Sequence, residues 1–346
     1  MGYRLYREEA LLRLAAADDR GAAGQRSGRP AGQEWYDVNW NPIIGCTAVG
    51  PGCAHCDAMQ AAAQLARMGG KSGAQYSGLV RMDDTGPAWT GEVRVRDDLL
   101  TWPLFRRGAR RILVGATSDL FHERIPNAVL DRLHAVVAVA RRHRFLVLTK
   151  RAERMRGYYD DPQTPCRILR ATEALPISAP AIPSGDWPLP NLWVGVSIED
   201  EDHIFRLREL AATPAALRWA AFEPLLGPVR PDAVPIADGL FDALRGIHYR
   251  LDGRGRPLGL DRPPWPALDW VLAGGETGAG ARPTHPDWVR RLRDLCTAAR
   301  VPFFFKQWGE WAPAEDERFG RRMVRLGRRA AGRRLDGAYW NQMPRA

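Results

Sequence analysis

The stretch Asn41-Pro-Ile-Ile-Gly-Cys-Thr-Ala-Val-Gly-Pro-Gly-Cys-Ala-His-Cys56 gathers three of the chain's five cysteines into one loop that follows a short apolar run. Cys53 and Cys56 are three residues apart, so both can bind one centre. The turn at residues 50–52 lets Cys46 fold back to join them. Three thiolates suit a four-iron cluster that leaves one iron open to a small ligand, whereas ordinary electron-transfer clusters use four. The spacing therefore predicts a metal centre in a loop after the first strand.

Outward from this loop, apolar runs of β type alternate with helical patterns, as expected of repeated βα units. Most of these runs are continuously apolar, which indicates a parallel sheet covered on both faces. The predicted fold class is α/β, a partial (βα)6-type, TIM-like barrel of parallel strands with rim insertions. Strands are predicted at 41–45, 111–116, 145–149, 192–197, 218–222, 269–273 and 302–305, and helices at 126–142, 202–212 and 286–299.

The predicted organisation is one large domain with additions. Residues 1–33 are expected to form an N-terminal helix, over 4–18, and a flexible linker, because a Gly, Ala, Ser and Pro mixture follows the helical pattern. The barrel is assigned to 34–312, with insertions at about 160–190 and 228–266, the second containing a short helical pattern at 237–244. Residues 313–346 are predicted to be a basic C-terminal extension.

The net charge of +10 comes almost wholly from arginine, since Lys71, Lys150 and Lys306 are the only lysines. Arginine's planar fork pairs with phosphates, so a nucleic acid or a nucleotide is a candidate partner. A solvated basic tail is the alternative, because net charge alone does not show that a protein recognises a nucleic-acid sequence. No run approaches a membrane span and no signal peptide is recognised, so we expect no membrane partner and a cytoplasmic location. The oligomeric state is not predicted.

Polar residues follow each predicted strand, where the loops of a βα barrel build its active site. Ser118 and Asp119 are equally explained as helix caps, and the glycines after the sixth strand as a flexible turn. His122 and His285 are more often structural than catalytic, and Trp308 and Trp311 are better explained by core packing. The candidates in chain order are Ser118, Asp119, Lys150, Arg151, Ser197, Glu199, Glu223, Gly274, Gly275, Glu276 and Lys306.

The order of these motifs resembles a variant of the radical S-adenosylmethionine superfamily. In particular it is similar to a phage-associated protein family of unknown function with three cysteines in a CX6CX2C pattern. The resemblance spans Trp35 to about Pro344. It rests on Asn39-Trp-Asn-Pro42, Gly45 to Cys56, Ser118-Asp-Leu-Phe-His122, Leu148-Thr-Lys-Arg151, Gly195-Val-Ser197, Phe222-Glu-Pro-Leu-Leu-Gly-Pro228, Gly274-Gly-Glu276 and Phe303-Phe-Phe-Lys-Gln-Trp-Gly309.

The resemblance implies an enzyme that reductively cleaves S-adenosylmethionine to a 5′-deoxyadenosyl radical acting on an unidentified substrate, for which a nucleic-acid base or nucleotide is the candidate. A reductant protein is the expected partner. It implies a [4Fe-4S] cluster on Cys46, Cys53 and Cys56. The resemblance also implies that Ser118 and Asp119 bind the methionine amine and that Ser197 and Glu199 bind the ribose. It assigns the adenosine or the substrate to Glu223 and the loop of Gly274, Gly275 and Glu276. It assigns an anionic substrate to Lys150, Arg151 and Lys306.

Two departures from the superfamily pattern concern the cofactor. Six residues instead of three separate the first two cysteines, and His55 stands where an aromatic residue often precedes the third. The Gly-Gly-Glu triplet follows a late strand instead of the second, which is why the amine is assigned to Ser118 and Asp119.

Two other functions remain open. The three cysteines, with His55 or a distant residue, could hold one zinc ion, although adjacent His55 and Cys56 would have difficulty binding the same ion. An inert nucleic-acid-binding barrel, whose basic tail contacts phosphates, is the other alternative.

Overall fold

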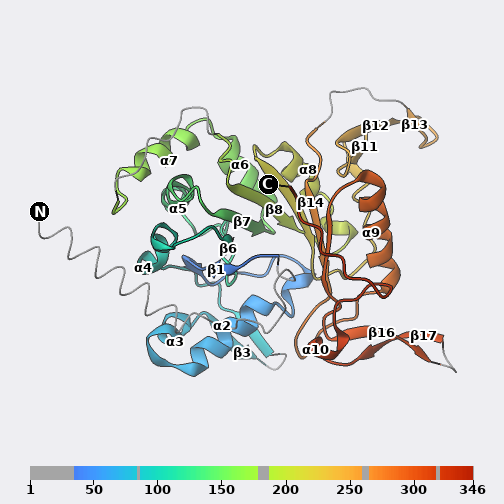
Figure 1. Cartoon of the computed structure of the whole chain (residues 1–346), viewed down its shortest axis with the longest axis horizontal. Helices are drawn as coiled ribbons and strands as arrows, with labels where there is room; N and C mark the ends of the chain where they lie inside the picture. Colours follow the sequence, from blue (N-terminus) through green and yellow to red (C-terminus); the bar gives the residue numbers. More distant parts are fainter. Residues whose placement is uncertain (1–34, 84–85, 178–186, 259–264, 317–319, 346) are drawn as a thin grey trace, which may run out of the picture.

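The computed structural model describes residues 35–345 apart from 84–85, 178–186, 259–264 and 317–319 (Figure 1). The predicted helix at 4–18 and its linker lie outside the described residues. Among the helices in the described part of the chain, none is long and apolar enough to cross a membrane.

A seven-stranded parallel sheet forms the centre of the molecule. Its strands are joined in chain order and the sheet curls into half a barrel (Figure 1). The prediction of an α/β fold with parallel strands is confirmed, whereas the TIM-like barrel stays a prediction. The strands in order are β1 (Val38–Trp40), β6 (Arg111–Val114), β7 (Arg144–Thr149), β8 (Leu192–Ser197), β9 (Leu217–Phe222), β14 (Trp270–Gly274) and β15 (Phe303–Gln307).

The first strand of the sheet lies earlier than predicted. β1 pairs with β6 in parallel and ends at Trp40, before Pro42. Proline lacks the N–H that a ladder needs, so the chain leaves the sheet there. The predicted strand at 41–45 is instead represented by β2 (Ile43–Ile44), which pairs antiparallel with β5 (Arg94–Val95).

The two faces of the sheet bury different side chains. On β9, Ala220 and Phe222 belong to the larger core cluster, whereas Trp219 and Ala221 belong to a second cluster, as the period of two in a strand requires. The second cluster contains Trp35, Trp193, Trp219 and Trp270, so tryptophans fill one face of the sheet. This face accounts for several of the chain's 13 tryptophans.

Helices pack on the larger cluster. They are α5 (Asn127–Val139), α6 (Ala152–Asp160), α7 (Thr164–Thr172), α8 (Arg206–Ala212) and α9 (Pro286–Ala299), with the short α4 (Asp97–Leu100) and the 3-10 turn η2 (Trp102–Phe105). Another 3-10 turn, η3 (Glu201–His203), precedes α8 and has no buried residue. The predicted helix at 286–299 is confirmed with the same bounds. It begins after His285, whose ring accepts a hydrogen bond from the main chain of Asp287, and ends at Arg300 in the left-handed region.

The predicted helical pattern at 237–244 is wrong. This segment contains β11 (Gly239–Asp242), in an antiparallel sheet with β10 (Val234–Ile236), β12 (Ile247–Leu251) and β13 (Pro257–Leu258). A Cβ on Gly239 would lie 2.0 Å from the Tyr249 carbonyl oxygen, so glycine permits the close approach of the two strands. Over eight residues the apolar spacing does not distinguish a helix from a strand.

The C-terminal region is folded against the sheet. β16 (Trp311–Asp316) and β17 (Gly320–Arg325) form a hairpin, followed by α10 (Arg328–Ala331). Beyond it, the main chain of Phe305 donates to the Trp340 carbonyl at 2.9 Å, and the Gln342 amide donates to the Phe303 carbonyl at 3.1 Å. The end of the chain therefore lies along β15, the outer strand of the sheet.

Candidate functional site

The cysteine loop crosses the carboxyl ends of the parallel strands. At its start, Gly45 forms a bridge with Ser118, which follows β6. In its centre is a 3-10 turn, η1 (Pro51–Cys53), and the carbonyl of Pro51 accepts a hydrogen bond of 2.8 Å from Arg282, after β14. Cys56 precedes α2 (Asp57–Met68), which continues into α3 (Gly70–Tyr76) and the hairpin of β3 (Val80–Asp83) and β4 (Gly86–Trp89).

Glycine lets the loop descend onto the ends of β7 and β8. A Cβ on Gly52 would lie 2.6 Å from Cγ of Glu199 and 2.8 Å from Nζ of Lys150. Gly45 has a φ of +89°, a conformation that side chains disfavour. The glycines flanking the cysteines thus place the thiols directly over the polar strand ends.

The three thiols are half-buried on this loop. Burial, together with the nearby Asp119 carboxylate, raises the pKa of Cys46 to about 12. Burial also raises the pKa of Cys56, and the Cys53 thiol adds to that effect. Cys46 and Cys56 are therefore protonated at neutral pH and must lose their protons when they bind a metal.

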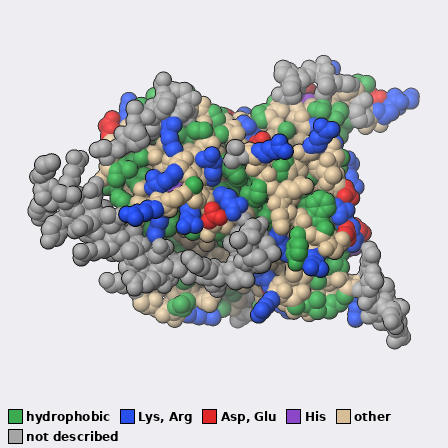
Figure 2. Space-filling view, in the orientation of Figure 1, with side chains coloured by type: hydrophobic (Ala, Val, Ile, Leu, Met, Phe, Trp, Pro, Cys, Tyr) green, Lys and Arg blue, Asp and Glu red, His purple; other side chains and the backbone are tan. Residues whose placement is uncertain are grey.

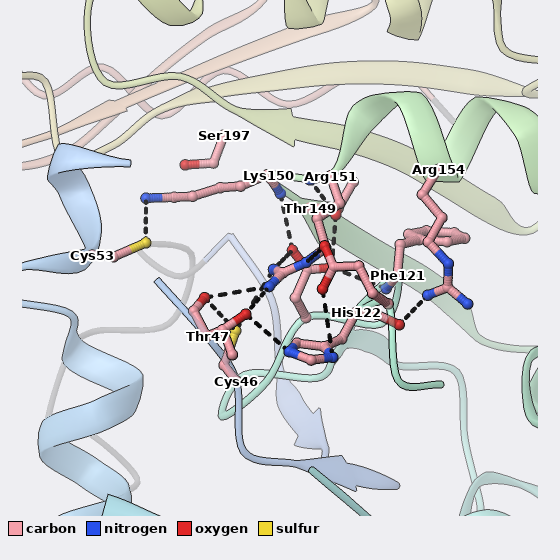
Figure 3. A network of polar contacts seen from close by, with 12 residues as sticks. Cys46, Thr47, Cys53, Phe121, His122, Thr149, Lys150, Arg151, Arg154 and Ser197 are labelled. Carbon is pink, nitrogen blue, oxygen red and sulfur yellow. Dashed lines mark hydrogen bonds and ion pairs between the residues drawn. The ribbon is translucent and has the colours of Figure 1, made fainter. Parts of the chain in front are cut away.

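Arg151 fastens the start of the loop to the sheet (Figure 3). Its Nε donates to Glu123 at 2.7 Å, and its Nη1 donates to Asp119 at 3.0 Å and lies 3.7 Å from Sγ of Cys46. Its Nη2 donates to the hydroxyl and carbonyl oxygens of Thr47, at 2.6 and 3.3 Å. Every nitrogen of this guanidinium is engaged, and the residue is only 7% exposed.

Asp119 and His122 complete this network. The Asp119 carboxylate also accepts from the Thr149 hydroxyl at 2.7 Å and from the Phe121 and Lys150 amides at 2.9 and 3.1 Å. Nε2 of His122 lies 3.0 Å from the Thr47 hydroxyl. Burial and the Arg151 charge lower the pKa of His122, so its ring is neutral at pH 7.

A second network lies beside Cys53. Nζ of Lys150 forms an ion pair with Glu199. The same nitrogen lies 3.9 Å from Sγ of Cys53 (Figure 3). The other Glu199 oxygen accepts from Arg206 at 2.6 Å, and Glu199 is fully buried. Burial alone would lower the pKa of Lys150, but Glu199 and the neighbouring thiols raise it, so the side chain is a cation.

Ser197, Glu223 and Lys306 meet at the ends of β8, β9 and β15. The Ser197 hydroxyl donates to the Glu223 carbonyl at 2.9 Å, and Nζ of Lys306 donates to Oε1 of Glu223 at 2.5 Å. Burial alone would lower the pKa of Lys306, and Glu223 raises it above its ordinary value. A Cβ on Gly274 would lie 3.0 Å from the same Glu223 oxygen.

The predicted ligand-binding glycines after β14 serve close contacts within the protein. A Cβ on Gly275 would lie 1.9 Å from the Trp308 carbonyl oxygen. The neighbouring Glu276 is held by Arg282 through two side-chain hydrogen bonds of 2.8 and 2.6 Å. Further along, the His55 ring packs against Gly280. This loop thereby binds both β15 and the cysteine loop.

The structure thus brings all the predicted strand-end residues to one edge of the sheet, close to the cysteine loop. Arg151, Glu199 and Glu276 are engaged in internal ion pairs, whereas the buried Ser118 hydroxyl has no hydrogen-bond partner among the described residues. Sequence reasoning missed Thr47, Arg206 and Arg282. Thr47 could have been found because it directly follows Cys46, whereas Arg206 and Arg282 each lie nine residues beyond the end of a predicted strand and carry no motif signal.

A preformed cage for one ion is not present in the described ranges, where no three His, Cys, Asp or Glu side chains are grouped to hold it. A zinc ion binds cysteine sulfurs at about 2.3 Å, so the thiolates of a zinc site lie close together around one ion. A four-iron cluster binds each thiolate at a different iron, so its sulfurs lie farther apart.

A protein-family match covers nearly the same residues as the described structure. Residues 31–344 match the family described as "Protein of unknown function (DUF5131)". The chain belongs to this family. Comparison with curated proteins and with solved structures finds no match. Phage association and kinship with the radical S-adenosylmethionine superfamily stay predictions.

Proposed function

We propose that this protein is an iron–sulfur enzyme that holds a [4Fe-4S] cluster on Cys46, Cys53 and Cys56 and uses it on S-adenosylmethionine. When bound, the cluster would supply the electron that splits the sulfonium and yields a 5′-deoxyadenosyl radical able to take hydrogen from a substrate. The observation that carries the proposal is the position of Lys150 and Arg151, whose cationic nitrogens lie 3.9 and 3.7 Å from the sulfurs of Cys53 and Cys46.

Those cations suit thiolates better than thiols. Deprotonated sulfurs of Cys53 and Cys46 would gain charge-assisted contacts with Lys150 and Arg151. The charge of Arg151 also lowers the pKa of Cys46, and that of Lys150 the pKa of Cys56, against the effect of burial. Residues around the ligands of a metal centre tune it in this way. Lys150 and Arg151, predicted from the sequence to bind an anionic substrate, are thus proposed as partners of the cysteines.

The remaining polar groups define where S-adenosylmethionine would bind. Ser118 offers a buried hydroxyl with no partner among the described residues, next to the bridge with Gly45, and is assigned to the methionine amine. Asp119 would act through Arg151 and Thr149, because its carboxylate already accepts four hydrogen bonds. Glu223 and Lys306 keep partly exposed side chains and are assigned to the adenosine or the substrate.

The test is reductive cleavage of S-adenosylmethionine by protein purified and reconstituted without oxygen. With dithionite, the wild-type protein should release 5′-deoxyadenosine, detected by mass spectrometry. Cys53→Ala should lose both the cluster and this product, because Cys53 is a proposed ligand. Cys166→Ala should retain both, since Cys166 is an exposed cysteine on α7.

Two outcomes would overturn the proposal. One is a protein that carries a full cluster and releases no 5′-deoxyadenosine with any low-potential reductant. The other is stoichiometric zinc bound by the same cysteines, which would establish the zinc alternative.

A further inference from the structure

Two turns at the amino ends of β6 and β7 are rich in arginine. They precede the strands at residues 106–111 and 141–144, and neither contains an aspartate or glutamate. The seven arginines, called here the amino-end arginine surface, are Arg106, Arg107, Arg110, Arg111, Arg141, Arg142 and Arg144.

The two turns lie side by side. The Arg144 amide donates to the Arg110 carbonyl at 2.8 Å, and Arg111 is the register partner of Arg144. Nε of Arg142 donates to the Arg106 carbonyl at 2.8 Å. Segments about 35 residues apart in the chain thus form one continuous surface.

The surface combines fixed and extended guanidinium groups. Arg142 is held by main-chain carbonyls, including that of Leu104 at 2.6 Å, and the Arg106 guanidinium lies 4.2 Å from the centre of the Trp102 ring. The Arg107 and Arg110 side chains are exposed. On the face shown in Figure 2, Lys and Arg side chains lie over both the half that holds α4 and α5 and the half that holds α9.

The positive charge of these arginines shifts the pKa values of neighbouring titratable groups. Burial alone would raise the pKa of Asp37, but its bonds to Arg111 and the charge of Arg110 lower it. Burial lowers the pKa of His143, and the charges of Arg142 and Arg110 lower it further. The facing groups therefore leave a strongly cationic surface.

We propose that the amino-end arginine surface binds the phosphodiester backbone of a nucleic acid. Arginine forks pair with phosphate oxygens in two-point contacts, and these clustered arginines, of which Arg111 is already paired with Asp37, match a regularly charged polymer. A membrane-binding face would add exposed large apolar side chains. None of those exposed in the described part of the chain, such as Met68 and Leu169, belongs to these turns.

The placement separates this surface from the cysteine loop. Parallel strands put their amino ends at one edge of the sheet and their carboxyl ends at the other, so the two sites lie at opposite ends of β6 and β7. The arginines would hold a nucleic acid to the protein without contacting the reacting atoms. Binding requires no cluster and is independent of the proposed function.

The experiment is fluorescence anisotropy of labelled 20-base-pair DNA and RNA duplexes with the full chain, at several salt concentrations. The triple variant R107E/R110E/R141E should bind at least about tenfold more weakly at 0.1 M salt. Its slope of log affinity against log salt should be shallower by about 2 to 3, because each lost phosphate contact removes about 0.9.

Two comparison variants carry the same charge change. R81E/R254E/R291E alters exposed arginines in other parts of the chain and should keep the larger part of the wild-type affinity and slope. R322E/R328E/R329E alters the C-terminal region, where the basic tail would otherwise make the contacts. Circular dichroism melts establish that each variant is folded, and R107Q/R110Q replaces the first variant if it is not.

The proposal is overturned if the amino-end variant binds as the scattered-site variant does, or if the C-terminal variant alone abolishes binding. Binding to phosphatidylserine vesicles with no binding to either duplex would also overturn it.

Discussion

At the scale of the residue, Arg151 decides where the first thiol lies. Its guanidinium joins Asp119, Glu123, Thr47 and Cys46, which come from two separate segments of the chain. The sequence identified Arg151 as a site residue because it follows a strand. It could not show that every donor is used within the protein, since this depends on Thr47 being folded back by the cysteine loop.

We therefore expect Arg151→Met to destabilise the protein by roughly 3 kcal/mol, because it leaves the buried Asp119 carboxylate without its cation. The free energy of unfolding in urea measures this. Arg132→Met is the matched control, since Arg132 forms an exposed ion pair with Asp97. This substitution should change the free energy of unfolding by less than about 1 kcal/mol. Equal effects of the two substitutions would show that Arg151 does not fasten the loop.

At the scale of the element, the loop after β14 shows how glycine permits close packing. The sequence predicted that its glycines let a ligand approach the backbone. The approach exists, but the partner at Gly275 is the main chain of Trp308. Spacing of glycines reveals a close approach without naming what approaches, because the partner lies more than thirty residues away.

Gly275→Ala should destabilise the protein by about 1 to 3 kcal/mol, since the added methyl group would lie 1.9 Å from a carbonyl oxygen that cannot move alone. Thermal unfolding of Gly253→Ala provides the comparison. No atom lies within 4 Å of the Cβ position there, so this variant should be neutral or slightly stabilised. Similar losses in both variants would contradict the packing explanation.

The contact between α5 and α6 predicts a pH dependence of stability. His134 is fully buried; its Nδ1 donates to the Leu130 carbonyl, and its Nε2 accepts from the Tyr159 hydroxyl, both at 2.7 Å. Burial lowers its pKa from 6.5 to about 4. The unfolded chain therefore takes up the proton first, and the stabilisation is complete above pH 6.5 and lost as the pH falls toward 4.

Relative to His134→Gln, the wild-type protein should lose about 3 kcal/mol of unfolding free energy between pH 7.5 and 4. Urea titrations of both proteins across this range measure the difference, in which the other titrating groups cancel. Parallel curves for the two proteins would mean that His134 does not resist protonation.

At the scale of the whole molecule, the sequence predicted the parallel strands well and their surroundings less well. Continuous apolar runs such as β8 and β14 are unambiguous, because both faces of the sheet are buried. The short apolar pattern at 237–244 predicts a helix, but the segment contains strand β11. The pairing of residues 340–342 with β15 could not be predicted, since it depends on long-range contacts such as that of Trp270 with Gln342.

The same distinction applies to the candidate site. The strand ends could be predicted to lie together, because parallel strands share one edge. Which charges neutralise one another could not, since Glu199 binds Arg206 from α8 and Glu276 binds Arg282, six residues further along the same loop. The proposed role of the edge as a whole depends on the metal centre of the cysteine loop.

The most direct test of that centre is the absorption spectrum, with iron and sulfide analysis, of wild-type protein isolated under nitrogen. The proposed function predicts a brown protein with absorption near 400 nm and about four iron and four sulfide ions per chain, as a single [4Fe-4S] cluster requires. A colourless protein that contains one zinc ion per chain, and that takes up no iron or sulfide on reconstitution, would contradict it.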